Sequence, residues 1–140
     1  MARMICITSG KGGVGKTNIS VNLALFIARI GYRACLFDAD LGLANVNILL
    51  GIYPEHTIED VISGEKQFEE ILVQNCQGID IVPGSSGVEK LTNVPKEQLE
   101  KLIDAFTTLN KYDFVIFDTS AGISKNVISF CMASPEVMLV

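Results

Sequence analysis

The chain has 140 residues, 49% hydrophobic and 19% charged, a composition typical of one globular domain that excludes a disordered chain. Eleven Lys and Arg against sixteen Asp and Glu give a net charge of −5, which excludes a general nucleic-acid coat. No apolar run approaches the roughly 20 residues that span a bilayer, and no signal-peptide pattern follows Met1. Four cysteines without C-x-x-C spacing are typical of reduced, buried thiols. We therefore expect a cytoplasmic protein.

The first part of the chain has the pattern of a strand, a loop, a helix and a second strand. Met4–Thr8 is a short apolar run that predicts a buried strand, and the glycine-rich segment Gly10–Gly15 predicts a loop. From Thr17 onward, apolar residues recur at three- and four-residue steps and predict a helix that ends before Gly31. Arg33–Phe37 predicts the second strand. Together these segments indicate a βαβ crossover.

The middle of the chain is less regular. Leu41–Leu50 predicts a functional loop that runs into a short helix. Thr57–Asp60 has the spacing of a capping box, which predicts a short helix ending at Gly64, and a further short helix is expected over Phe68–Val73. Ile79–Val82 predicts a third strand.

The last part continues the alternation of helices and apolar strands. A helix is expected after Pro95, and Phe114–Phe117 predicts a fourth strand that ends on Asp118. A helix-like stretch over Val127–Met132 precedes a fifth strand that begins at Val137. This order predicts an α/β fold with a mostly parallel sheet and helices on both faces. Because the chain stops inside a strand, we expect residues 1–140 to be the N-terminal part of a longer domain, incomplete at its C-terminus.

The segment Gly10-Lys-Gly-Gly-Val-Gly-Lys-Thr17 matches the pattern G-x-x-x-x-G-K-[ST] between a predicted strand and a predicted helix. Such glycines let backbone N–H groups surround a phosphate, and the N-terminus of the following helix adds a positive dipole. Lys16 is expected to reach the β- and γ-phosphates, and the Thr17 hydroxyl to ligate Mg²⁺. Asp118 is placed to hold the same Mg²⁺ through a water. The alternative is a glycine turn that only caps a helix. The predicted nucleotide-binding residues are Gly10, Lys11, Gly12, Gly13, Val14, Gly15, Lys16 and Thr17.

Three motifs resemble those of one family. Lys11–Thr17 resembles the deviant Walker A motif of the MinD/ParA family of P-loop ATPases, Asp38–Asn45 resembles its switch I, and Asp118–Ile123 its switch II. The resemblance implies a P-loop NTPase fold and a Mg²⁺-dependent ATPase that is slow unless a partner stimulates it. It also implies a molecular switch that forms an ATP-dependent homodimer.

The resemblance further implies roles for three residues outside the core of the loop pattern. Lys11 would be a catalytic lysine that reaches the nucleotide of the partner subunit, although the spacing alone also fits a solvated surface lysine. Asp40 would position the attacking water, and Asp38 would lie beside the Mg²⁺ site. From the residues alone, the two aspartates could equally form a surface turn with a capping role.

Within this family, Asp118–Ser124, Lys16–Ala24 and Leu41–Gly51 resemble the flagellar-number regulator branch (FlhG, also called FleN or YlxH) more than the division-site branch. That branch implies control of the number or placement of a cellular structure, flagella or the division site. It also implies a protein partner that stimulates hydrolysis, and reversible binding to the inner face of the cell membrane through a C-terminal helix absent here. Specific nucleic-acid binding is not expected.

Three alternatives stay open from the sequence. The first is a ParA-type ATPase that partitions DNA, which the acidic composition disfavours. The second is a metabolic P-loop enzyme that uses ATP to activate a carboxylate. The third is an incomplete domain with an exposed apolar sheet. His56 has no second ligand at a metal-binding spacing and is expected to be a surface-loop histidine.

Overall fold

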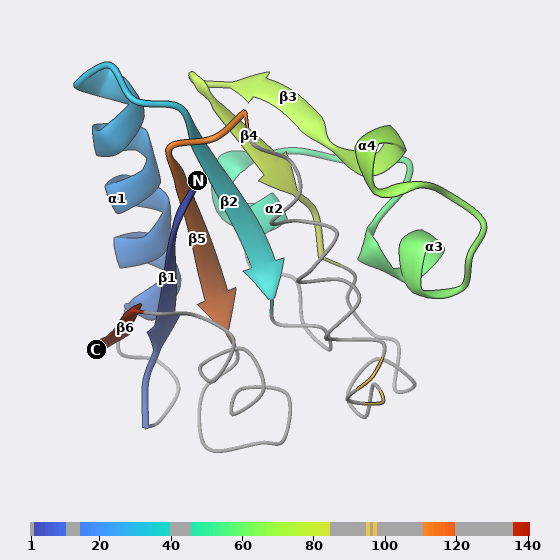
Figure 1. Cartoon of the computed structure of the whole chain (residues 1–140), viewed down its shortest axis with the longest axis horizontal. Coiled ribbons are helices and arrows are strands. Elements are labelled where there is room, and N and C mark those ends of the chain that lie inside the picture. The colour runs from blue at the N-terminus through green and yellow to red at the C-terminus, as the bar shows by residue number, and fades with distance from the viewer. Residues whose placement is uncertain are drawn as a thin grey trace.

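The computed structural model describes residues 2–10, 15–39, 46–84, 95, 97, 111–119 and 136–140. In chain order the elements of this part are β1 (Arg3–Thr8), α1 (Lys16–Arg29), β2 (Ala34–Ala39), α2 (Val46–Leu50), α3 (Ile58–Ile62), α4 (Phe68–Ile71), β3 (Val73–Cys76), β4 (Ile79–Val82), β5 (Phe114–Thr119) and β6 (Glu136–Leu139). The strands form one sheet in the order β3-β4-β2-β5-β1-β6 (Figure 1). Every neighbouring pair is parallel except β3 and β4.

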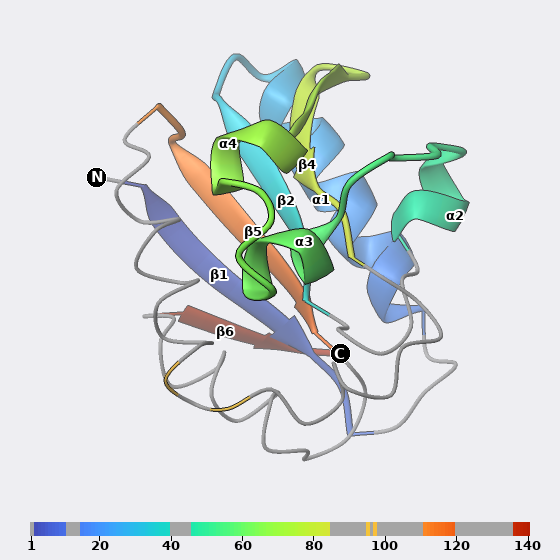
Figure 2. The ribbon, with the colours of Figure 1, turned by 90° about the vertical axis from the view of Figure 1, so that its right-hand side faces the viewer.

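Helices cover both faces of this sheet. Successive residues of its central strands point to opposite sides, so these apolar strands present hydrophobic side chains on both faces. In Figure 1 the sheet separates α1 from α3 and α4, and Figure 2 shows α3 and α4 in front of the strands. Buried residues of α1 and α2 pack with Ile7, Leu36 and Ile116 on one face. Those of α3 and α4 pack with Cys6, Phe37 and Phe117 on the other. The predicted α/β architecture with a mostly parallel sheet is confirmed.

The predicted strands and the first helices agree with the structure to within a few residues, with one exception. Strand β3 was not predicted, because its four residues, Val73–Cys76, follow α4 directly and lack an apolar run. It forms an antiparallel pair with β4, and the turn between them uses left-handed backbone at Gln77 and Gly78. The helices expected after Pro95 and over Val127–Met132 lie outside the described residues.

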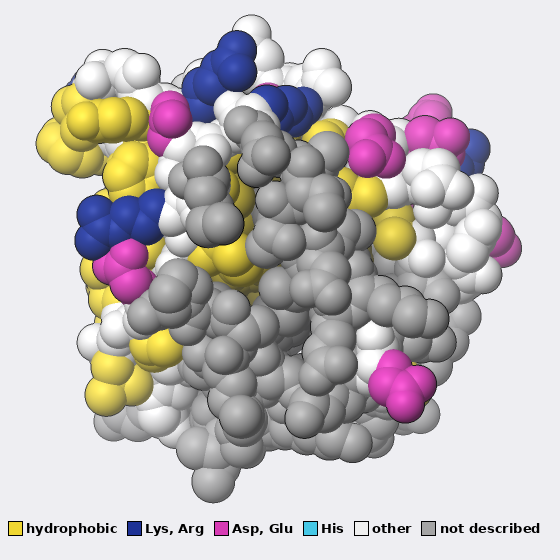
Figure 3. All heavy atoms as spheres, viewed as in Figure 1, with side chains coloured by type: hydrophobic (Ala, Val, Ile, Leu, Met, Phe, Trp, Pro, Cys, Tyr) yellow, Lys and Arg dark blue, Asp and Glu magenta, His cyan; other side chains and the backbone are white. Residues whose placement is uncertain are grey.

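One side of the molecule is rich in exposed apolar side chains. Figure 3 shows hydrophobic atoms along the side formed by α1 and β6. The large apolar residues exposed on these two elements are Ile19, Phe26, Val137, Met138 and Leu139. Among the strands that the structure describes, β6 pairs with β1 and lies at the edge of the sheet. No helix in the described ranges is long and apolar enough to cross a membrane.

Candidate functional site

The predicted glycine loop connects the end of β1 to the start of α1. Gly15 caps the N-terminus of α1 with a φ of 88°. Its carbonyl accepts the first helical hydrogen bond, from Ile19 N at 3.0 Å. Because residues with a Cβ rarely adopt this left-handed backbone, the loop needs glycine at this position. Residues 11–14 lie outside the described residues, so the roles of Lys11, Gly12, Gly13 and Val14 remain predictions.

Asp118 and the first two residues of α1 form a hydrogen-bonded cluster. Asp118 is fully buried near the end of β5, and its Oδ1 accepts a hydrogen bond from Lys16 Nζ at 2.6 Å. Its Oδ2 accepts from the Thr17 hydroxyl at 2.8 Å. Lys16 is itself buried, so this ion pair is a short, charge-assisted contact away from bulk water. The structure therefore brings together three residues that the sequence assigned to phosphate and Mg²⁺.

Ser20 completes this cluster and was not predicted. Its hydroxyl lies 2.9 Å from Asp118 Oδ1 and 3.0 Å from the carbonyl oxygen of Lys16, and the residue is fully buried. The signal was present in the sequence, because residues four apart on a helix lie on the same face. Because Ser20 comes one helical turn after Lys16, its hydroxyl could have been assigned to the same site.

Asp38 lies beside Asp118 in the sheet and contacts the start of α2. The two aspartates are register partners on the parallel strands β2 and β5, and both are fully buried. Asp38 Oδ2 accepts a hydrogen bond from Val46 N, at the start of α2, at 3.2 Å. Asp38 thus caps the start of α2, as the surface-turn alternative expected of it. That alternative is wrong in placing Asp38 at the surface, because the residue is fully buried. Asp40 lies outside the described residues, and its role remains a prediction.

Gly84 and Asn47 support Asp38 from the side of β4. A Cβ atom built on Gly84 would lie 2.9 Å from Asp38 Cγ and 3.1 Å from its carbonyl oxygen. The Asn47 side-chain amide donates a hydrogen bond to the Gly84 carbonyl at 3.1 Å. In the sequence, Gly84 follows the predicted strand Ile79–Val82 by two residues. No sequence pattern pointed to this close approach, because it depends on how β2 and β4 pair.

A second polar cluster lies near the amino-terminal ends of β2 and β5. The Tyr112 hydroxyl donates to Asp80 Oδ2 at 2.6 Å. Burial raises the pKa of Tyr112, and its hydrogen bond to Asp80 raises that pKa further. Burial and the charge of Asp80 also hold the pKa of the Cys35 thiol well above its usual value. Cys6 and Cys35 are buried free thiols, as predicted, and Cys76 is half-buried. A raised thiol pKa disfavours the reactive thiolate, so this cluster has a structural character.

His56 belongs to the N-terminus of α3. Its Nδ1 lies 3.3 Å from Asp60 Oδ2, and the same carboxylate accepts a hydrogen bond from Thr57 N at 3.1 Å. Thr57 and Asp60 form the predicted capping box. The histidine is partly exposed and close to a loop, in agreement with the expectation from the sequence.

The donor set at Asp118 fits a hard cation. In the part of the chain that is described, no group of three or more His, Cys, Asp or Glu side chains could hold a metal ion. Mg²⁺ beside phosphates needs less than that, since it commonly takes one or two carboxylates and fills its other positions with phosphate oxygens and water. A hydroxyl and a carboxylate oxygen 2.8 Å apart, as in Thr17 and Asp118, are ligands of the required type.

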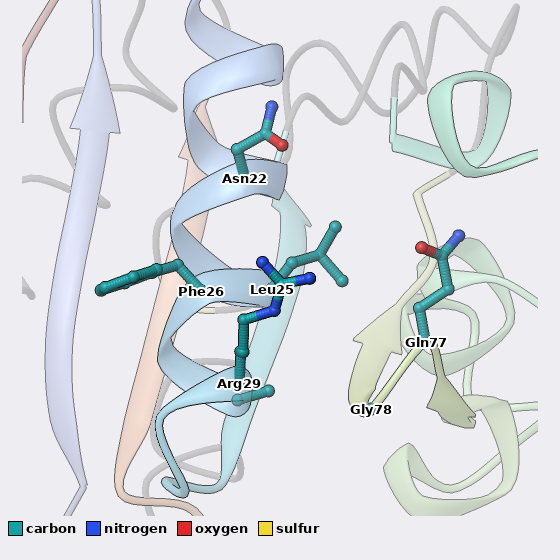
Figure 4. A pocket seen from close by; sticks show the side chains of 7 residues that line it. Asn22, Leu25, Phe26, Arg29, Gln77 and Gly78 are labelled. Atoms are coloured by element: carbon teal, nitrogen blue, oxygen red, sulfur yellow. The ribbon is translucent and has the colours of Figure 1, made fainter.

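A groove elsewhere on the molecule is separate from this cluster. It lies between the second half of α1 and the β3–β4 turn and is lined by Leu25 and Arg29, and Figure 4 shows Leu25 pointing from the helix toward Gln77. Phe26 points away from the turn. Lys16 and Arg29 are at opposite ends of α1, about 20 Å apart at 1.5 Å per residue. The groove is therefore remote from the cluster around Asp118.

Comparisons with known proteins agree with this geometry. A family model described as an AAA domain, AAA_31, matches residues 2–140. The chain is 47% identical over 139 residues to the antiactivator FleN of Pseudomonas aeruginosa, covering 99% of this chain and 50% of that protein. It is 40% identical to the flagellum site-determining protein YlxH of Helicobacter pylori, covering 99% of this chain and 47% of that protein. The chain thus spans about half the length of these curated relatives.

Solved structures show the same fold. The septum site-determining protein MinD of Pyrococcus horikoshii, complexed with Mg-ADP, matches with a TM-score of 0.87 and 31% identity, covering 100% of this chain and 58% of that chain. The cell division ATPase MinD of Pyrococcus furiosus matches with a TM-score of 0.86 and 31% identity, covering 100% of this chain and 59% of that chain. The expected P-loop fold and the resemblance to MinD and to the flagellar-number regulators are confirmed.

Proposed function

We propose that this chain, which belongs to the AAA_31 family of AAA domains, binds MgATP between β1 and α1, hydrolyses it slowly, and acts as a nucleotide-dependent switch. The observation that carries the proposal is the buried cluster in which Lys16 and Thr17 contact Asp118. It combines a phosphate-binding lysine, a Mg²⁺-binding hydroxyl and a carboxylate at the end of a strand. That combination serves phosphoryl transfer, whereas a glycine turn that only caps a helix would need none of the three.

Binding would rearrange the contacts of this cluster. Backbone N–H groups of residues 10–15 would surround the phosphates, and the N-terminus of α1 would add its dipole. Lys16 would exchange Asp118 for the β- and γ-phosphate oxygens. Thr17 and Asp118 would hold Mg²⁺, Asp118 through a water, with Asp38 beside the site. Bound Mg²⁺ would neutralise charge on the phosphate oxygens.

Hydrolysis would follow from the positions that these residues impose on water and phosphate. A water oxygen would form a bond to the γ-phosphorus while the bond from that phosphorus to the bridging oxygen breaks, giving ADP and phosphate. Asp40 would orient the water, and Lys16 would stabilise charge on the phosphate oxygens. Lys11 of the partner subunit would add a second positive charge. Because Lys11 would come from the partner subunit, the constellation would be complete only in a dimer, and turnover would be slow until a partner protein stimulates it.

The biological role proposed is control of the number or placement of flagella or of the division site. Relatives named antiactivator, flagellum site-determining protein and septum site-determining protein support this role over DNA partitioning or carboxylate activation. A structure of such a relative is described as a MinC:MinD complex, which supports a regulatory protein partner. The proposal includes a cytoplasmic protein that associates reversibly with the membrane.

Nucleotide binding is tested first, by titrating a fluorescent ADP analogue with Mg²⁺ present. Lys16→Ala should reduce affinity at least 100-fold, because it removes the positive charge closest to the phosphates. Lys66→Ala is the control, since Lys66 lies between α3 and α4 on the other face of the sheet. Equal affinity of Lys16→Ala and wild type would refute the assignment of the site.

The switch is tested by sedimentation velocity of the wild type and of Lys11→Ala, each with MgADP and with a non-hydrolysable MgATP analogue. A dimer that forms only with the ATP analogue, and is lost in Lys11→Ala, is the expected result. A monomer in every condition would contradict the ATP-dependent dimer. Hydrolysis that requires a small carboxylic acid would support the metabolic alternative, and salt-sensitive binding to non-specific DNA would support partitioning.

A further inference from the structure

Within the part of the chain that the structure describes, three side chains of α1 donate hydrogen bonds to Asp118, and the proposed nucleotide binding would affect each of them differently. Lys16 and Ser20 contact Oδ1 at 2.6 and 2.9 Å, and Thr17 contacts Oδ2 at 2.8 Å. Under the proposed function, Lys16 turns to the phosphates and Thr17 turns to Mg²⁺. Ser20 is the donor of these three that is assigned no contact with the nucleotide or with Mg²⁺.

We propose that Ser20 is a positioning residue, which holds the Asp118 carboxylate in place for Mg²⁺ when Lys16 and Thr17 engage the nucleotide. This inference rests on the proposed function of the same site. Ser20 acts through Asp118 and does not touch the nucleotide, since it is fully buried one helical turn beyond Lys16.

The geometry favours Asp118 as the acceptor of the Ser20 hydroxyl. The hydroxyl has one hydrogen and two acceptors within reach, Asp118 Oδ1 at 2.9 Å and the Lys16 carbonyl at 3.0 Å. A carboxylate is the stronger acceptor, because hydrogen bonds to an ionised group are about twice as strong as those between neutral groups. In the interior of the protein, where water does not compete, this preference fixes the orientation of the hydroxyl.

The backbone that carries Asp118 is fixed independently of Ser20. Asp118 pairs with Ile7 of β1 and with Asp38 of β2, at the centre of the sheet. The next residue, Thr119, donates its hydroxyl to the Ile7 carbonyl at 2.8 Å. Loss of the Ser20 hydroxyl would therefore leave the strand in place and free only the carboxylate. A defect confined to Mg²⁺ binding is the expected consequence.

The expected loss of Mg²⁺ affinity can be estimated from other metal sites. Removing a partner that orients a metal-binding carboxylate typically costs 10- to 100-fold in metal affinity. We therefore expect Ser20→Ala to raise by about 10-fold or more the Mg²⁺ concentration that gives half-maximal tightening of ADP binding. Affinity for ADP in EDTA should stay within about 2-fold of wild type, because Lys16 and the glycine loop remain.

The test compares Ser20→Thr with Ser20→Val in the protein, since the two side chains have the same shape and only threonine keeps the hydroxyl. Fluorescent ADP is titrated in EDTA and then against increasing Mg²⁺, and Ser20→Ala is measured in parallel. Thr should retain the Mg²⁺ response of wild type, whereas Val and Ala should need about 10-fold more Mg²⁺ for the same tightening of ADP binding. Val21→Ala is the control, because it truncates a neighbouring buried residue that has no polar group.

The possible outcomes separate the two proposals. A Mg²⁺ response that is equal in Ser20→Thr and Ser20→Val would overturn the role of Ser20, and so would an equal loss in Ser20→Ala and Val21→Ala. Any cost of adding a methyl group in the core is common to Thr and Val and cancels in their comparison. If the wild type itself binds no ADP, the proposed function fails before the role of Ser20 is reached.

Discussion

A side chain at position 84 should destabilise the protein, because Gly84 lies against the carboxylate of Asp38. A Cβ atom at position 84 would lie 2.9 Å from Asp38 Cγ, 0.5 Å inside the 3.4 Å at which ordinary contact begins. The Asp38 carbonyl oxygen, at 3.1 Å, is backbone of the central strand β2. The carboxylate cannot swing away without losing its hydrogen bond from Val46 N. Gly84→Ala therefore forces either the loop after β4 or the Asp38 side chain to move.

The magnitude follows from two opposing effects. Adding a methyl group to a packed interior typically costs about 1–3 kcal/mol. Replacing glycine by alanine also restricts the unfolded chain, which stabilises the folded state by about 0.4–1 kcal/mol where the backbone is compatible. The net expectation for Gly84→Ala is a loss of about 1–2 kcal/mol in the free energy of unfolding.

Urea unfolding followed by circular dichroism measures this loss. Gly10→Ala is the matched control, because a Cβ there would meet no atom of the described residues within 4 Å. It should change the free energy of unfolding by less than about 0.5 kcal/mol. The cost of Gly84→Ala should shrink in an Asp38→Ala background, from which the crowded Cγ is absent. An unchanged cost in that background, or none in the wild type, would refute the proposed crowding.

Three further predictions concern stability and thiol chemistry. The pKa values of Cys35 and Tyr112 are raised in the folded protein, so the unfolded chain loses these protons at a lower pH. The free energy of unfolding should therefore be highest below about pH 8.5 and fall progressively as the pH rises above it. Urea unfolding midpoints between pH 7 and pH 10.5 measure this decrease. Tyr112→Phe should make the decrease smaller above about pH 10, and a wild-type stability that does not change with pH would contradict the raised pKa values. Cys35 should resist iodoacetamide at pH 8 until the protein unfolds, and mass spectrometry of the native protein would show any early modification. Thr57→Ala should cost about 1 kcal/mol in urea unfolding through loss of the α3 cap, whereas no change would mean that Asp60 alone caps this helix.

The sequence was sufficient to predict the fold wherever local pattern and tertiary structure agree. Apolar runs such as Met4–Thr8 and Phe114–Phe117 are strands of the sheet interior, where burial on both faces removes the alternation of polar and apolar residues. The capping box at Thr57 is a purely local signal and was also read correctly. Strand β3 was missed because an edge strand of four mixed residues carries almost no local signal.

The residues of the candidate site also fall into two groups, those that local sequence patterns predict and those that depend on tertiary structure. Lys16, Thr17 and Asp118 were predicted because the spacing of the loop and the end of a strand are visible in one dimension. Ser20 could have been added from helical periodicity. The contact of Gly84 with Asp38 could not, because it arises from the pairing of β2 with β4, whose residues are more than forty positions apart in the chain.

The charges of the site imply that nucleotide and cation binding are coupled. Lys16 pairs with the buried carboxylate of Asp118 in the structure described. When that lysine turns to a phosphate, Asp118 keeps hydroxyl partners but loses its cation, and breaking a buried ion pair typically costs about 3–5 kcal/mol. A divalent cation bound with the nucleotide offsets this cost, because it restores a positive charge beside the carboxylate. Linkage then requires that Mg²⁺ tighten nucleotide binding by the same factor by which nucleotide tightens Mg²⁺ binding. Asp118 is therefore the residue through which the two ligands of the proposed switch are expected to depend on each other.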